Sequence, residues 1–581
     1  MKARSLVGPC LASLVLAAAC GDDGTASDTN ATTDGQTTSG GTTTAGSDGT
    51  SGTTTAGSDS SGEATTATTS ATSSGGETTG PGETDSDTDT DTDTDTGDTG
   101  DTGDTPAICD SPLDLYDTSS PTVVIGSGTP ESCTGQDLKA AAELGGTITF
   151  DCGPDPVTIA LDETIVLPIN TDTIIDGEGL VTLDAGGKTR HFFFNHPDWM
   201  NNPTRIVLQR MTFTGGKAPV GEYFDQDPQN PKCAYGYKEG SGGVIYVRNG
   251  VLHVIDSRFE NNEAALVGPD VGGGAIYVVG VPEVTISGSR FVSNRAANGG
   301  AIGMLFANPL IYNSHFEDNT AEGIGQNYVE PGCPNFNHDE QGGAGGNSGA
   351  VYFDGLNDED HTYVICGTTF VNNRANELGG ALFRTPNIGK REMLLDRDLF
   401  DANTGRLGGV SFIKDNHVTV QATTFMNNRS GVNVMGEELG GPLGGLWINN
   451  GSADVENSTF YNNNPTGLDV SGDGGTVTNA TFVGGRPQGV SVNNSLFVDV
   501  TCPEALSGAN NLQWPEASAC VAGISFADPG LGAIGDNGGP TPTAAPAADG
   551  AAEGVGSGCP GVDQRGEPRD PNSCAAGAVE P

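Results

Sequence analysis

A motif of Phe, two variable residues and Asn recurs seven times between residues 259 and 463. The copies begin at Phe259, Phe291, Phe316, Phe370, Phe400, Phe425 and Phe460. Successive copies are 32, 25, 54, 30, 25 and 35 residues apart, and most lead into a Gly-Gly or Ser-Gly pair followed by an apolar residue. One such unit cannot bury its own apolar side chains, whereas a stack of units can. The shortest spacings therefore indicate one coil of a β-solenoid, with insertions in the longer ones.

The segments that lead into the motif have the alternation of β-strands. Examples are 252–259, 283–291 and 362–370, where β-branched and apolar residues alternate with polar ones. Asn, Gly and Asp separate these runs, and they tolerate the left-handed backbone of tight turns. Stacking of the coils places Phe on Phe and Asn on Asn. We therefore expect an internal ladder in which each Asn amide bonds to the next coil, with a ligand contact as the alternative role for these residues.

Two resemblances support a solenoid. The Phe-x-x-Asn and Gly-Gly-Ala-Ile motifs resemble the repeat of chlamydial polymorphic outer membrane proteins. The wider pattern, including TIIDGEGLVTLDAGG at 173–187, resembles the right-handed β-helix (pectin-lyase-like) superfamily over roughly residues 147–500. The resemblance implies an all-β fold, a right-handed parallel β-helix. It implies no single activity, because that superfamily includes lyases, hydrolases, adhesins and proteins with no known reaction.

The first 105 residues predict export and attachment to a membrane. Residues 1–19 have the charged start and short apolar run of a signal peptide, and the run is too short to span a bilayer. Ala-Ala-Ala-Cys then resembles a bacterial lipobox, which implies lipidation of Cys20; ordinary signal cleavage near Cys20 is the alternative. The residue after Cys20 is Gly and not Asp, so we expect the outer membrane or cell surface.

Residues 20–105 predict a disordered linker, since they are Ser, Thr, Gly and Asp with few apolar side chains. Residues 21–105 carry 18 acidic side chains and no Lys or Arg, so the linker should extend by self-repulsion. The whole chain has a net charge of −50, of which −34 belongs to residues 106–581. An acidic body argues against nucleic acid as a partner.

Both ends of the solenoid are predicted to be capped. Within 106–146, the amphipathic stretch from Asp137 to Leu144 predicts a short helix, and it resembles the helix that caps many right-handed β-helices. Residues 501–581 contain GDNGGPTPT at 535–543 and a Cys-bounded segment at 559–574. These resemble the choice-of-anchor Q region that follows β-helices in bacterial surface proteins, which implies a C-terminal cap.

Ten cysteines remain after Cys10 and Cys20 are set aside, and an even number in an exported chain predicts disulfides. The nearest neighbours in sequence give three pairs, Cys133–Cys152, Cys502–Cys520 and Cys559–Cys574. A further pair, Cys233–Cys333, would join two long insertions at 217–240 and 322–346. No partner is assigned to Cys109 or Cys366.

No catalytic pattern is evident in the sequence. It has no zinc spacing, no G-x-S-x-G and no polygalacturonase pattern of paired Asp residues. No cofactor is therefore expected, apart from a calcium ion that Asp354, Asp358 and Asp360 could hold in an acidic turn. A solvated turn between strands is the alternative interpretation of those three carboxylates.

One possible binding surface follows from register. If each Phe of the motif points inward, the residue before it points outward. In three successive coils this residue is Arg258, Arg290 and His315. Such a basic strip would place its side chains one strand spacing, about 4.8 Å, apart, and it could bind an acidic glycan. The alternative is that these are ordinary exposed strand positions.

The sequence therefore predicts a surface lipoprotein that presents a β-helix for binding or display, with acidic polysaccharide as a possible ligand and no catalysis. The alternative is a polysaccharide lyase or glycoside hydrolase with its site among the insertions. The sequence does not fix the ligand or the oligomeric state.

Overall fold

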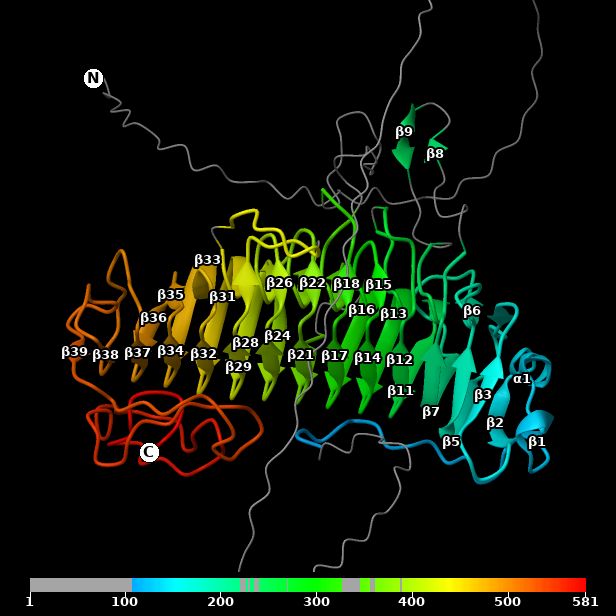
Figure 1. The fold of residues 1–581 in the computed structure, drawn as a ribbon, viewed down its shortest axis with the longest axis horizontal. Coiled ribbons are helices and arrows are strands. Elements are labelled where there is room, and N and C mark those ends of the chain that lie inside the picture. The colour runs from blue at the N-terminus through cyan, green and yellow to red at the C-terminus, as the bar shows by residue number, and fades with distance from the viewer. Residues whose placement is uncertain are drawn as a thin grey trace, which may run out of the picture. The chain divides into compact units, whose positions relative to one another are not determined.

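The computed structural model describes residues 107–581, apart from 220–225, 228–229, 235–239, 269, 326–344, 356–360, 387–388 and 442; it gives the backbone alone for 226–227 and 230–234. These residues form a parallel β-helix. Nearly all of its strands belong to one parallel sheet that winds from coil to coil (Figure 1). Each complete coil contributes strands to three stacks, which we call the first, second and third strand stacks.

The three stacks are defined by their pairing register. The first stack contains β4 (Ile165–Val166), β6 (Phe192–Asn195), β10 (Ile245–Arg248), β13 (Ile276–Ser287), β16 (Ile302–Tyr312), β19 (Val351–Asp354), β23 (Leu382–Thr385), β27 (Ser411–Lys414), β31 (Leu446–Glu456), β33 (Thr466–Thr478) and β35 (Arg486–Gln488). The second stack contains β1 (Val123–Gly126), β2 (Gly146–Asp151), β5 (Thr173–Asp184), β7 (Arg205–Thr214), β11 (Val251–Ile255), the later parts of β13 and β16, β20 (Tyr363–Cys366), β24 (Arg391–Asp396), β28 (Asn416–Gln421), the later parts of β31 and β33, and β36 (Ser491–Asn493). Long strands such as β13 thus turn a corner of the coil and join two stacks.

The third stack carries the repeated Phe. It contains β3 (Val157–Ala160), the later parts of β5 and β7, β12 (Arg258–Glu260), β14 (Arg290–Val292), β17 (His315–Glu317), β21 (Thr369–Val371), β25 (Leu399–Asp401), β29 (Thr424–Met426), β32 (Thr459–Tyr461), β34 (Thr481–Val483), β37 (Leu496–Val498), β38 (Leu512–Trp514) and β39 (Ser525–Phe526). A short parallel sheet follows it, with β15 (Arg295–Ala296), β18 (Thr320–Ala321), β22 (Arg374–Ala375), β26 (Thr404–Gly405) and β30 (Arg429–Ser430). In one insertion, β8 (Gln226–Asp227) and β9 (Asn230–Ala234) pair antiparallel.

The Phe residues form a continuous stack inside the solenoid, as the repeat predicts. The rings of Phe259 and Phe291 lie 4.6 Å apart between centroids, and those of Phe291 and Phe316 lie 4.7 Å apart, with nearly parallel planes. The stack extends beyond the seven motif copies to Phe213 at one end and Phe497 at the other. Every motif Phe is fully buried, so the coils share one apolar core.

The Asn residues of the motif form the expected internal ladder. Asn319 Nδ2 donates to Asn373 Oδ1 at 2.9 Å, and Asn373 Nδ2 donates to Asn403 Oδ1 at 3.0 Å. The same pattern joins all seven from Asn262 to Asn463, and each has at most 3% exposure. The residue before each Asn has a left-handed backbone, for example Asn427 with φ of 56°. The Asn side chains therefore satisfy one another's polar groups, which confirms the structural interpretation of the ladder.

A second ladder was not expected from the sequence. The residue two places before each Phe is usually Ser or Thr, and its side-chain oxygen accepts a backbone N–H of the preceding coil. Ser257 N–H donates to Ser289 Oγ at 3.1 Å, and Thr423 N–H donates to Ser458 Oγ at 3.3 Å. We call this the hydroxyl ladder. Asp398 occupies one position in it, and its carboxylate accepts from Thr368 N–H at 2.8 Å.

The N-terminal end has the predicted helix. A 3-10 turn (η1, Pro130–Ser132) precedes α1 (Gly135–Ala142), which begins two residues earlier than expected because Thr134 caps it by accepting a hydrogen bond from the Asp137 N–H. Leu138, Ala141 and Ala142 of α1 are buried against the first coil. The helix therefore covers apolar side chains at this end of the core.

The C-terminal region differs from the predicted cap. The strands continue past residue 500 to β39, and residues 527–581 lie along the flank of the last coils and not across their end (Figure 1). Gln564 shows this placement, because its side chain bonds to Thr424, Thr459 and Thr541 at 2.6–2.9 Å. The reason is that the outward side of the third stack bears Thr in these coils, and Thr hydroxyls give the segment a row of hydrogen-bonding partners.

Candidate functional site

The predicted strip exists as a geometric row. Arg258 pairs in register with Arg290, and Arg290 with His315, on the adjacent strands β12, β14 and β17. Their side chains are 25–35% exposed, whereas the Phe between them and the next outward position is fully buried. The register therefore places three nitrogen-bearing side chains on the outer face of neighbouring coils, as the repeat predicts.

The strip is not a surface of free positive charge. Arg258 Nε donates to Glu260 at 3.2 Å, Arg290 lies 3.6 Å from the Glu317 carboxylate, and His315 Nε2 lies 3.0 Å from the same group. Burial lowers the pKa of His315, against the opposing effect of Glu317. His315 is thus largely neutral at pH 7, and the two glutamates offset the two arginines. The glutamates come from the residue after each Phe, which shares the outward face.

Similar pairing extends over the neighbouring outward positions. On the short parallel sheet, Arg295 contacts Glu263, which also contacts Lys217 at 2.8 Å. Arg429 contacts Glu438 at 2.6 Å. These arginines and acids form a mosaic of alternating charge on the outside of the coils. Such a mosaic offers many hydrogen-bonding groups to a ligand but little net attraction for a polyanion.

The acidic turn proposed for calcium is only partly within the described residues. Asp354 ends β19, and its two carboxylate oxygens accept hydrogen bonds from Thr385 Oγ1 at 2.6 Å and Tyr352 Oη at 3.0 Å. Asp358 and Asp360 lie outside the described residues. Asp354 is therefore already held by two hydroxyl groups of neighbouring strands, and a calcium ion at this turn stays a prediction.

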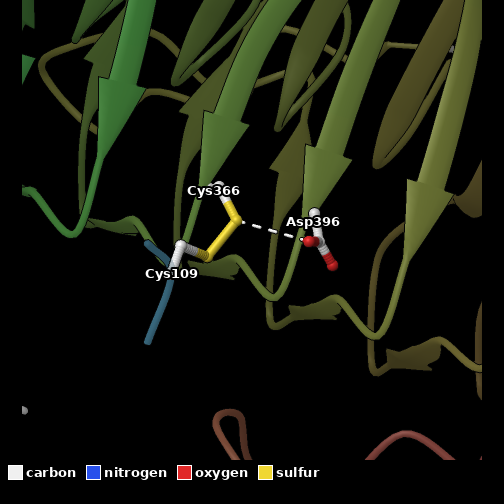
Figure 2. Close-up of side chains that lie close together, drawn as sticks. All are labelled: Cys109, Cys366 and Asp396. Atoms are coloured by element: carbon white, nitrogen blue, oxygen red, sulfur yellow. Dashed lines mark hydrogen bonds between the residues drawn. A yellow bond between two sulfur atoms is a disulfide. The ribbon is translucent and has the colours of Figure 1, made fainter. Parts of the chain in front are cut away.

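Among the described residues, the group of potential ligands close enough to share a metal ion is Cys109, Cys366 and Asp396. The two sulfur atoms form a disulfide, and Cys366 Sγ lies 3.3 Å from the Asp396 carboxylate (Figure 2). Metal ligation by cysteine requires thiolates, so this group is a covalent link in the oxidised protein and not a metal site. The sequence assigned neither cysteine, because the two are 257 residues apart.

The three disulfides predicted from sequence distance are all present in the structure. They join Cys133 to Cys152, Cys502 to Cys520 and Cys559 to Cys574. The fourth predicted pair, Cys233–Cys333, stays a prediction. Cys333 and the side chain of Cys233 lie outside the described residues, as does Cys20.

The Cys109–Cys366 disulfide fixes a segment that sequence reasoning missed. Residues 107–120, which we call the strap, run without secondary structure along the outer face of the second stack before the chain enters β1 (Figure 1, blue). The strap binds side chains from coils far apart in sequence, including Gln209 and Asn313. No repeat or spacing in the sequence signals these contacts, because each is made once.

Two solved structures are similar to this chain, and both are of PfbA, a surface adhesin of Streptococcus pneumoniae. They have 13% sequence identity to it and cover 67% of it, with 86% and 85% of their own chains aligned and TM-scores of 0.30 and 0.27. This degree of similarity implies nothing about the activity or the ligand of the chain. No family model and no curated protein matches the sequence. Among the described residues, no helix is long and apolar enough to cross a membrane.

Proposed function

We propose that the chain is a surface lipoprotein whose β-helix binds or displays and does not catalyse. The observation that carries this proposal is the row of Arg258, Arg290 and His315, since a linear polymer presents its own groups at regular intervals along such a row. The arginines offer paired donors that suit carboxylate or sulfate groups. Acidic polysaccharide is thus the candidate ligand, and Cys20 is the candidate attachment to the outer membrane or cell surface.

The geometry limits the strength of this binding. A carboxylate of the ligand has to compete with Glu260 and Glu317 for the same guanidinium groups. Exposed contacts of this kind contribute roughly 0.5 kcal/mol each and weaken with salt. We therefore expect weak, salt-sensitive binding of acidic glycans, and weaker binding of neutral ones.

The test uses the full-length protein and polygalacturonate as the probe, with dextran as a neutral polymer. The double change Arg258→Ala and Arg290→Ala should weaken polygalacturonate binding about fivefold at low salt, the equivalent of about 1 kcal/mol, without lowering the melting temperature. Arg429→Ala, an exposed arginine of the same mosaic on β30, is the matched control and should leave binding unchanged. Equal affinity of the double variant and the wild type would remove the strip from the proposal.

Two further measurements test lipid attachment at Cys20 and the absence of catalysis. Cys20→Ala should move the protein from the membrane fraction to the soluble fraction, and unchanged partition would contradict lipid attachment. Incubation with polygalacturonate should release no unsaturated ends that absorb in the ultraviolet. Their appearance would replace the non-catalytic proposal by the lyase alternative.

A further inference from the structure

The strap is held by two amide side chains that each clamp its backbone. Gln209 Oε1 accepts from the Tyr116 N–H at 2.9 Å, and Gln209 Nε2 donates to the Tyr116 carbonyl at 3.1 Å. Asn313 Oδ1 accepts from the N–H groups of Ile108 and Cys109 at 2.9 Å, and Asn313 Nδ2 donates to the Cys109 carbonyl at 2.8 Å. Because each clamp satisfies donors and an acceptor at once, the strap is docked at fixed positions near both of its ends.

Side chains of the strap reinforce this docking. The Tyr116 hydroxyl lies 2.6 Å from His253 Nδ1, and His253 Nε2 lies 2.8 Å from Glu283. Glu283 can only accept when ionised, so His253 carries its proton on Nε2, and Nδ1 accepts from the tyrosine. Thr118 donates to the fully buried carboxylate of Asp176 at 2.7 Å. The strap thus packs against polar side chains of the second stack.

The covalent link lies at the far end of the strap. Cys109 is bonded to Cys366, the last residue of β20, and the Arg397 guanidinium donates to the Ile108 carbonyl at 3.0 Å beside it. Strand β20 is an interior strand, since it pairs with β16 on one side and β24 on the other (Figure 2). The disulfide closes a loop with a sequence separation of 257, and the coils from β1 to β20 lie inside it.

We propose that the Cys109–Cys366 disulfide transmits mechanical force between the part of the chain before residue 107 and the middle of the solenoid. We call this disulfide the bolt. When the chain is pulled between that part and a point after Cys366, the force passes from Cys109 through the sulfur atoms to β20, so the residues between the two cysteines carry none of it. Without the bond the same pull would detach the strap, which hydrogen bonds alone would then hold, and would next act on β1. Among the described residues, β1 pairs with β2 alone and over four residue pairs, so it would be the first strand to peel.

The bolt also encloses the candidate binding strip, because Arg258, Arg290 and His315 all lie between Cys109 and Cys366. The protection of the binding strip by the disulfide rests on the proposed function, in which the residues before 107 are the tether to the membrane. A ligand held at the strip would then pull on coils whose two chain ends cannot separate. The solenoid would keep its binding surface folded under a load that would otherwise unravel it from the edge strand.

Extension of single full-length molecules, pulled between their two termini, tests the bolt. At about 3.5 Å per residue, the closed loop less the 19-residue Cys133–Cys152 loop stores about 800 Å of chain, or about 480 Å if Cys233 and Cys333 are also bonded. The double change Cys109→Ser and Cys366→Ser should therefore lengthen the fully unfolded molecule by one of these amounts and lower the force of the first unfolding event. The control Cys502→Ser and Cys520→Ser should add only about 60 Å.

If the double variant does not fold, the wild type is measured before and after a reductant is added to the folded molecule. A gain of about 1,000 Å is then expected, because the reductant also opens the Cys133–Cys152, Cys502–Cys520 and Cys559–Cys574 loops. Equal lengths in all variants, or a gain in length with an unchanged first unfolding force, would overturn the proposal. Neither readout depends on lipid at Cys20 or on a glycan. Failure of the bolt is therefore distinguishable from failure of the proposed function.

Discussion

Removal of one amide from the middle of the Asn ladder should be among the most costly single changes in this protein. The Asn373 side chain makes four hydrogen bonds. It accepts from Asn319 N and Asn319 Nδ2 at 3.1 and 2.9 Å, and donates to the Phe316 carbonyl and Asn403 Oδ1 at 2.9 and 3.0 Å. All four lie in a site with no solvent exposure.

The expected loss of stability follows from the number of hydrogen bonds that the Asn373 side chain makes. Each buried hydrogen bond contributes about 1 kcal/mol net, and the change also leaves the Asn319 N–H buried without an acceptor. Asn373→Ala should therefore lower the free energy of unfolding by about 4 kcal/mol. Asn373→Asp keeps the acceptors but loses the donors while it is ionised, so it should be as harmful at pH 7 and less harmful in acid, where a protonated carboxyl can donate once.

The matched control is Asn427→Ala. Asn427 is a half-buried turn residue of the same repeat and makes two side-chain hydrogen bonds, with Asp401 and Asn462. Its left-handed backbone, with φ of 56°, is also adopted by Ala402 at the equivalent position, so alanine is tolerated there. We expect a loss of at most about 1 kcal/mol from the control. Urea unfolding followed by circular dichroism measures both variants, and equal losses would refute the ladder argument.

Three other changes test the core and its buried ionisable groups. Phe370→Ala should cost about 3–5 kcal/mol, because it interrupts the ring stack and leaves a cavity, whereas Phe370→Leu should cost clearly less; similar urea midpoints for the two would contradict this. Burial lowers the pKa of His191 to about 4, so the folded state binds fewer protons than the unfolded state, and stability should fall by about 2 kcal/mol between pH 7 and pH 5 through this group. His191→Gln should flatten that part of the pH profile, and an unchanged slope would show that other groups cause it. Burial raises the pKa of Asp398, so its contribution is lost as the pH rises above the unfolded value; Asp398→Thr should stabilise the protein at pH 7 and less so at pH 4, and a loss at both values would show that the carboxyl is needed.

Repetition explains why part of the fold was predictable. Phe370 and Asn373 stack on their counterparts because a parallel register, once set by the repeat, is imposed on every coil. The same logic correctly predicted the row of Arg258, Arg290 and His315. It could also have revealed the hydroxyl ladder, because Ser or Thr stands two residues before most of the repeated Phe residues.

The paired charge of the strip is also predictable from the sequence. Glu260 and Glu317 stand two residues after Arg258 and His315, and residues two apart on a strand share a face. The alternation that places the arginines outward therefore places the glutamates beside them. The net charge of such a strip therefore has to be predicted from both outward-facing positions of each strand, the residue before the Phe and the residue after it.

The strap could not be predicted from periodicity. Its contacts with Gln209, Asn313 and Cys366 join residues that are 93 to 257 positions apart, and each occurs once. Proximity in sequence predicts a disulfide only when the loop it closes is short, as for Cys133–Cys152. A long closure is decided by the three-dimensional path of the chain across the coils, which the sequence of either partner does not encode locally.

The strap and the C-terminal segment together cover one corner of the solenoid. The turn that follows the second stack meets the strap at Asn313 and Arg397, and in the next coil it meets the C-terminal segment at Ala422, whose carbonyl accepts from Thr541. Figure 1 shows the two segments along the same edge of the coils, one in blue and the other in red. Each segment satisfies backbone and amide groups at this corner, so both act as structural covers.

The C-terminal segment limits where a ligand can reach the third stack. The C-terminal segment buries the outward Thr residues of the third stack from Thr424 onward, while the earlier coils keep Arg258, Arg290 and His315 partly exposed. The open part of the third stack thus includes the three coils of the strip, which the Cys109–Cys366 bond encloses, and also β21 and β25, which follow Cys366. A covalently closed set of coils with a partly exposed polar face would suit the proposed binding of a partner under tension, because the disulfide keeps the two ends of that set together when a load is applied.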